Sequence, residues 1–187
     1  MDSTTIIIVV VALVILGAIL GLVFSRRRRS ERLHKEFGTE YEHAVESMGG
    51  DKKAQTELEN RQKHVKTLTI RPLSETERER YQVDWAAVQS KFVDEPRQAI
   101  IDADHLIIEV MQLRDYPVSD FDQRAADISV QYPALVSNYR AARAIAVKNM
   151  EHKADTEELR NAIIHYRSLF DELLKPEAVE MEEESVR

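Results

Sequence analysis

Residues 6–24 read IIIVVVALVILGAILGLVF, and residues 25–29 continue directly with SRRRR. The 19-residue stretch Ile6–Phe24 contains neither a charged residue nor a proline. As an α-helix it would be roughly 28 Å long at ~1.5 Å per residue, which matches the hydrocarbon core of a bilayer. A helix also satisfies its own backbone hydrogen bonds, as lipid requires. This stretch therefore predicts a single transmembrane helix that tethers the protein to a membrane.

Charges beside the apolar run predict its orientation. Residues 1–5 contain no lysine or arginine, whereas a basic cluster follows the run, made of Arg26, Arg27, Arg28, Arg29, Arg32 and Lys35. Basic residues near a span stay in the cytoplasm, so we expect a short translocated N-terminus and a cytoplasmic C-terminal part. A cleaved signal peptide is the alternative. It is disfavoured because its basic residues would precede the apolar core and a small-x-small site would follow it.

The composition of the remaining chain limits its partners. There is no cysteine, so neither disulfides nor thiolate metal sites occur. Residues 1–29 carry four arginines against one aspartate, so of the chain's net −7 the remaining 158 residues carry −10. Such an acidic part disfavours nucleic acid as a partner. The basic cluster is better explained by the anionic headgroups of the bilayer that it adjoins.

Beyond the basic cluster the pattern predicts an all-α protein. The chain has only five glycines and five prolines and shows no sustained apolar–polar alternation. One helix is expected to end at Gly49-Gly50, and its apolar face recurs at Leu33, Phe37, Tyr41, Ala44 and Met48. The following stretch Asp51–Leu68 has a thin apolar stripe among many charges, typical of a hairpin or stalk. Residues 25–70 are therefore assigned to a basic juxtamembrane segment and helical stalk or hairpin.

Residues 72–174 are predicted to form a compact bundle of four to five helices. Capping boxes are expected to begin three of them, at Ser74/Glu77, Ser119/Asp122 and Asp155/Glu158, and Tyr132-Pro133 to open another. The stretch Arg97–Arg114 is apolar on most sides, as a central helix requires. Trp85 lies on an apolar stripe and is expected to be buried. Residues 175–187 form an acidic tail that we expect to be disordered.

Three segments of the soluble part carry a family resemblance. They are residues 71–74 (RPLS), residues 120–127 (DFDQRAAD) and residues 165–167 (HYR). With them the chain resembles a family of small bacterial helical proteins, secreted or membrane-bound, that have no known activity. The resemblance implies a bacterial inner-membrane location. It implies no substrate, cofactor or catalytic residue.

Few residues are candidates for chemistry. Asp102, His105 and Glu109 lie at steps of three and four on one face of the most apolar helix, so they are the weak candidates for a metal site. Such a site would need a further ligand such as His165, and the alternative is a solvated edge of a central helix. Two Glu-x-x-His motifs, at residues 31–34 and 40–43, match the spacing of di-iron bundles. Because both are expected in one helix, they are interpreted as surface charge.

The charged segment of residues 120–127 is a candidate partner surface. Asp120, Gln123, Arg124 and Asp127 fall at helical spacings of three and four, which stabilise an exposed short helix by ~0.2–0.5 kcal/mol per pair. The alternative interpretation is a solvated face without a partner. No phosphate-binding loop and no nucleophile elbow occurs in the sequence.

The apolar run also contains a dimerisation motif. Gly17 and Gly21 form a Gly-x-x-x-Gly, which lets two membrane helices approach closely. The heptad-like stripe after the run would extend a homodimer into a coiled coil. Chance is the alternative, since glycine is common in membrane helices.

Two function classes remain open. The favoured one is a non-enzymatic, single-pass membrane protein that binds or organises another protein at the cytoplasmic face, without a cofactor. The alternative is a metal-dependent enzyme that uses the Asp102, His105 and Glu109 face of the central helix.

Overall fold

The structure is a computed structural model, and it describes residues 16–17, 20–21, 24–25 and 27–176. Within these ranges the ordered elements are α-helices and no strand occurs, so the all-α prediction is confirmed. In the same ranges, no helix is both long and apolar enough to cross a bilayer. Most of the apolar run, Arg26 and residues 177–187 of the acidic tail lie outside the described residues.

The described chain divides into two compact units, with the boundary between Asn60 and Arg61. This boundary falls inside α3 (Asp51–Thr67) and not near residue 71. The last turns of α3 contact α6 (Phe121–Gln131): Nε2 of His64 lies 3.6 Å from Oδ1 of Asp127. These contacts explain why the end of α3 belongs with the bundle.

The first unit contains a helix over 27–37, α2 (Thr39–Met48) and the beginning of α3. The single helix predicted through residues 33–48 is wrong, because Gly38 adopts φ 52° and interrupts it. A positive φ is accessible to glycine without steric cost. Met48 of the predicted apolar stripe is 37% exposed, but the rest of the stripe is buried with two residues of α3 in a small core: Leu33, Phe37, Tyr41, Ala44, Ala54 and Leu58.

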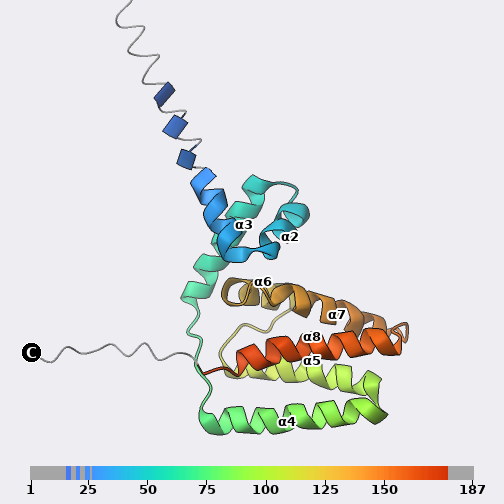
Figure 1. Ribbon diagram of the computed structural model, residues 1–187. Helices are drawn as coiled ribbons and strands as arrows, with labels where there is room; N and C mark the ends of the chain where they lie inside the picture. Colours follow the sequence, from blue (N-terminus) through green and yellow to red (C-terminus); the bar gives the residue numbers. More distant parts are fainter. Residues whose placement is uncertain (1–15, 18–19, 22–23, 26, 177–187) are drawn as a thin grey trace, which may run out of the picture. The chain divides into compact units, whose positions relative to one another are not determined.

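The second unit contains a bundle of five helices between Glu75 and Leu173. They are α4 (Glu75–Asp94), α5 (Pro96–Leu113), α6, α7 (Val136–Met150) and α8 (Thr156–Leu173). The central position predicted for α5 is confirmed, since it packs against α4, α7 and α8 (Figure 1). α6 packs against α7.

Side-chain caps fix most helix starts of the bundle. The capping boxes predicted at Ser74/Glu77 and Asp155/Glu158 are both present. The box predicted at Ser119/Asp122 is wrong: Asp120 caps α6, because its extended backbone aims its carboxylate at the Gln123 N–H, 2.9 Å away. α7 begins at Val136 rather than at Tyr132-Pro133, because residues 133–135 form a turn.

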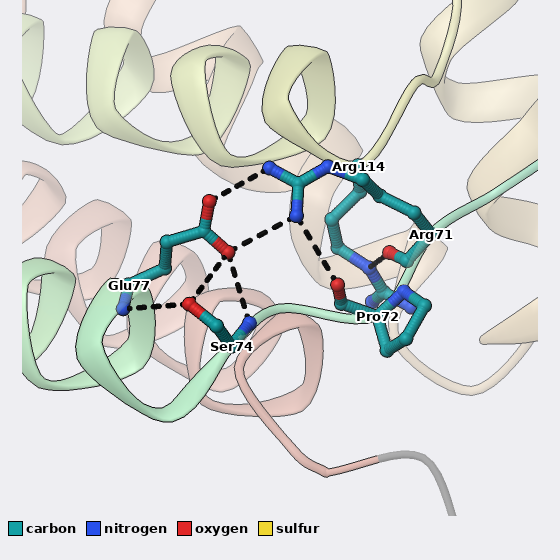
Figure 2. A network of polar contacts seen from close by, with 5 residues as sticks. All are labelled: Arg71, Pro72, Ser74, Glu77 and Arg114. Atoms are coloured by element: carbon teal, nitrogen blue, oxygen red, sulfur yellow. Dashed lines mark hydrogen bonds and ion pairs between the residues drawn. The ribbon is translucent and has the colours of Figure 1, made fainter.

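One buried arginine, Arg114, joins the segment before α4 to the ends of two helices; Figure 2 shows its contact with Arg71. The side chain of Arg114 is 1% exposed. Its Nε donates to the Arg71 carbonyl (3.2 Å), and its Nη1 donates to the Tyr132 hydroxyl (3.2 Å) and the Leu173 carbonyl (3.1 Å). The Arg71 N–H donates in return to the Arg114 carbonyl at 3.2 Å. Arg114 therefore holds the entry to α4 against the end of α8.

Arg71 also contacts the first turn of α4 (Figure 2). Its Nη1 and Nη2 donate to the two carboxylate oxygens of Glu77 at 3.0 and 2.8 Å. The same carboxylate accepts from the Ser74 backbone N–H at 2.9 Å. The hydrogen bonds from Arg71, and then from the Ser74 backbone, lower the pKa of Glu77 from about 4.5 to about 2.

Replacement of Trp85 by alanine should destabilise the bundle by roughly 3–5 kcal/mol. Trp85 is 5% exposed and stacks on Phe170 of α8 with ring centroids 4.6 Å apart, so the truncation leaves a cavity between α4 and α8. Urea unfolding followed by circular dichroism measures the loss. Trp85→Phe retains a stacked ring and should cost less. A loss below ~1 kcal/mol for the alanine variant would show that Trp85 is not a core residue.

The Arg71–Glu77 contact should make stability depend on acid pH. Because the pKa of Glu77 is lower in the folded protein, its contribution is present above about pH 4.5 and is lost as the pH falls toward 2. In Glu77→Gln the thermal midpoint should therefore decline less between these pH values than in the wild type. Glu75→Gln, in the same helical turn, is the matched control and should leave the pH profile unchanged. Identical profiles for wild type and Glu77→Gln would contradict the prediction.

Candidate functional site

The basic cluster of the first unit is divided between paired and open side chains. Nε and Nη2 of Arg29 donate to the two carboxylate oxygens of Glu59 at 2.6 and 2.5 Å. Nη2 of Arg32 lies 3.5 Å from the same carboxylate, and Nε of Arg27 lies 2.9 Å from Glu31. The predicted cluster is therefore not one uniform patch, because part of its charge is neutralised within the unit.

All described members of the cluster except Arg29, which is half-buried, face solvent. Arg28 and Lys35 are exposed, and the described part of the chain gives neither of them a carboxylate partner. The guanidinium carbon of Arg28 lies 4.3 Å from the ring centroid of Phe24, the last residue of the apolar run. This cation–π contact places the Arg28 guanidinium beside the end of the apolar run.

The face of α5 that was considered for a metal does not gather ligands. Asp102 accepts from Nζ of Lys91 at 2.8 Å and from Nε2 of Gln98 at 2.9 Å, whereas His105 and Glu109 are exposed. Across the residues that the structure describes, no group of three or more His, Asp or Glu side chains is arranged to hold a metal ion. The Glu-x-x-His motifs lie on two helices rather than one, since Gly38 separates them.

The candidate partner surface on α6 is largely internal. Arg124 is 6% exposed and donates to the Tyr139 hydroxyl at 3.1 Å and to the Val118 carbonyl at 3.2 Å. Asp127 is fully buried and accepts from Nε2 of Gln123 at 2.9 Å, and burial raises its pKa. The predicted exposed helix laced by Arg124 ion pairs is therefore wrong. Only Asp120 is fully accessible, and Gln123 is half-buried.

A buried polar cluster that the sequence did not single out lies between α5, α7 and α8. Asp104 is 6% exposed and accepts from the Tyr166 hydroxyl and from Nη1 of Arg143, each at 2.9 Å. Tyr139 contacts Tyr166 edge-on with centroids 6.3 Å apart. Burial raises the pKa of both tyrosines, so that their hydroxyls stay protonated and that of Tyr166 can donate to Asp104. One sequence signal for this cluster was available: Asp104 lies between Ala103 and Ile107, which are both buried. A carboxylate at a buried position requires polar partners.

An open groove of about 680 Å³ lies where the α4–α5 turn meets the end of α7. We call it the end groove. Its lining consists of Asp94, Glu95, Pro96, Arg97, Gln98, Ile101, Asn149, Met150 and His152. Its volume lies in the range of small-molecule and peptide side-chain sites.

Hydrogen bonds fix the walls of the end groove. Arg97 donates to Oδ1 of Asn149 at 3.2 Å and to the Ala154 carbonyl at 3.0 Å, and Nδ2 of Asn149 donates to the Arg97 carbonyl at 2.8 Å. Met150 offers an apolar side chain that is 57% exposed. The carboxylates of Asp94 and Glu95 form no hydrogen bond or ion pair within the described residues. The arrangement is a pre-formed, partly apolar groove with an acidic rim.

Comparison with known proteins gives no relative: no family model, curated protein or solved structure matches this chain. The resemblance of residues 71–74, 120–127 and 165–167 to an uncharacterised bacterial family therefore stays a prediction.

Proposed function

We propose that this chain is a single-pass protein of the bacterial inner membrane whose cytoplasmic helical part binds another protein without catalysing a reaction. The observation that carries the proposal is the junction of the apolar run Ile6–Phe24 with the basic cluster. Basic residues lie on one side of the run only, which favours a translocated N-terminus. The Phe24–Arg28 pair supports an interfacial position for this junction.

The end groove supports a binding role for the bundle. Three of the charged groups inside the bundle, Asp104, Arg114 and Arg124, are engaged in hydrogen bonds between helices. The end groove instead presents an accessible methionine and two carboxylates on walls that are already fixed. Pre-organised walls reduce the entropy lost on binding. A segment of another protein with apolar and basic side chains fits this surface best.

A second copy of the chain is a further proposed partner, through the membrane helix. Gly17 and Gly21 are both helical, and a Cβ added at either would meet no atom within 4 Å. That open space is where the backbone of a second helix packs in a Gly-x-x-x-Gly dimer.

Residues 30–187 should be protected from protease added outside intact spheroplasts and should be digested once the membrane is opened. The reason is the one-sided basic cluster, which retains its flank in the cytoplasm. An immunoblot against the C-terminal bundle measures protection, with a known periplasmic protein as the digestion control. Digestion of the bundle from outside would overturn the proposed orientation. Release of the protein by alkaline extraction would overturn the anchor itself.

A photo-crosslinking residue placed at Met150 should give a discrete protein adduct in the native host. The same residue at Ile164 of α8, which is equally exposed at 56%, is the matched control and should give none. The adduct at position 150 should disappear in Asp94→Lys, because the partner's basic side chains would then be repelled from the rim. Equal adducts at both positions, or an adduct that Asp94→Lys leaves unchanged, would contradict a binding role for the end groove.

A further inference from the structure

We propose that a stripe of three residues, Arg28, Arg32 and Lys35, binds the phosphate groups of anionic phospholipids. Arg29 does not take part, because its guanidinium is bound to Glu59. We call these three residues the outward stripe. The inference rests on the membrane anchoring proposed above. It assigns different roles to neighbouring arginines that the sequence presents as one run.

The outward stripe lies on one face of the helix over 27–37. Steps of four and three residues place Arg28, Arg32 and Lys35 one above the other. The apolar face of the same helix is formed by Leu33 and Phe37, which are buried in the core of the first unit. All three basic side chains are exposed. The stripe is about 10 Å long at ~1.5 Å per residue.

Arg29 is excluded from the outward stripe by its contact with α3. Two parallel hydrogen bonds of 2.6 and 2.5 Å to Glu59 use one edge of its guanidinium. A bidentate arginine–carboxylate pair is among the strongest polar contacts in proteins. The pair joins residues 30 positions apart, and so ties the helix over 27–37 to α3. Arg29 is therefore a structural residue of the first unit.

Arg32 remains available although it approaches the same carboxylate. Its Nη2 lies 3.5 Å from Oε1 of Glu59, beyond the range of a strong charge-assisted hydrogen bond. Its side chain is 58% exposed, whereas that of Arg29 is 37% exposed. The rest of the Arg32 guanidinium can therefore donate to a ligand oxygen.

The position of the outward stripe favours lipid phosphate over free phosphate. Its first residue lies over the ring of Phe24, where the apolar run ends. A headgroup phosphate at this level is presented by a lipid whose acyl chains contact the same run. Cations next to an anionic surface contribute about 1 kcal/mol each. The contribution is specific to negatively charged headgroups, so a zwitterionic lipid should bind much more weakly.

The test uses the full chain in a neutral detergent, titrated with dioctanoyl-phosphatidylglycerol. Dioctanoyl-phosphatidylcholine, titrated in parallel, tests whether binding needs a net negative headgroup. Inorganic phosphate tests whether binding needs a lipid at all. Binding is measured by native mass spectrometry. Arg28→Gln, Arg32→Gln and Lys35→Gln should each weaken phosphatidylglycerol binding about fivefold, which corresponds to about 1 kcal/mol per cation. Lys52→Gln, an exposed lysine of α3 in the same unit, is the matched control and should change binding by less than twofold.

Two further variants test the role of Glu59. Arg29→Gln should change phosphatidylglycerol affinity by less than twofold but lower the thermal midpoint of the chain, because it removes the contact to α3. Glu59→Gln should strengthen phosphatidylglycerol binding by up to about fivefold, because it releases one more cation. Circular dichroism of each variant shows whether the helices are retained.

Several outcomes would overturn the inference. Equal weakening by Arg29→Gln and Arg28→Gln, with unchanged thermal midpoints, would show that all arginines of the run act alike. Equal weakening by Lys52→Gln would show that only net charge matters. Equal affinity for the two lipids, or for inorganic phosphate, would exclude an anionic-lipid surface. The protease-protection experiment tests the topology independently. If the chain is anchored but the lipid titrations contradict the inference, only the role of the outward stripe is rejected and the proposed topology stands.

Discussion

The packing of the bundle depends on the hydrogen bonds that the buried side chain of Arg114 donates. A guanidinium that is 1% exposed would be costly to bury unless its donors were satisfied. Its partners include the Tyr132 hydroxyl, the Leu173 carbonyl and the Arg71 carbonyl, which Figure 2 shows. These groups belong to the segment before α4, the end of α6 and the end of α8. Movement of any one of the three segments would therefore remove a hydrogen bond from a buried guanidinium.

The same constraint explains how the bundle uses its other internal polar groups. Asp104 is satisfied by Tyr166 and Arg143, and Arg124 by the Tyr139 hydroxyl. Each contact links different helices, so burial of polar groups specifies which helices pack together as well as how tightly. Groups engaged in this way are unavailable to a substrate. At the end groove, in contrast, carboxylates and a methionine stay accessible.

In the first unit, too, one charged side chain is bound within the fold while its neighbours face outward. Its core is small, and the Arg29–Glu59 pair joins two of its helices through residues that lie 30 positions apart in the sequence. The neighbouring basic residues of the outward stripe have no such contact of comparable strength. The arginines form a uniform run in the sequence, but in the fold Arg29 has a structural role and its neighbours face outward. The difference follows from the helical angle of each residue and from the position of one carboxylate on α3.

The sequence by itself determined the helical class, the apolar run with its one-sided charge, the caps at Ser74 and Asp155 and the buried stripe of Trp85. These features are local, since helix periodicity and capping depend on residues three or four positions apart. Only the tertiary structure decided the break at Gly38, the burial of Arg124 and the partners of Asp104 and Arg114. Asp104 meets Tyr166 across 62 residues, and Arg114 meets Leu173 across 59. Periodicity reports which face of a helix is buried, but the polar partner on that face is selected by how distant helices pack.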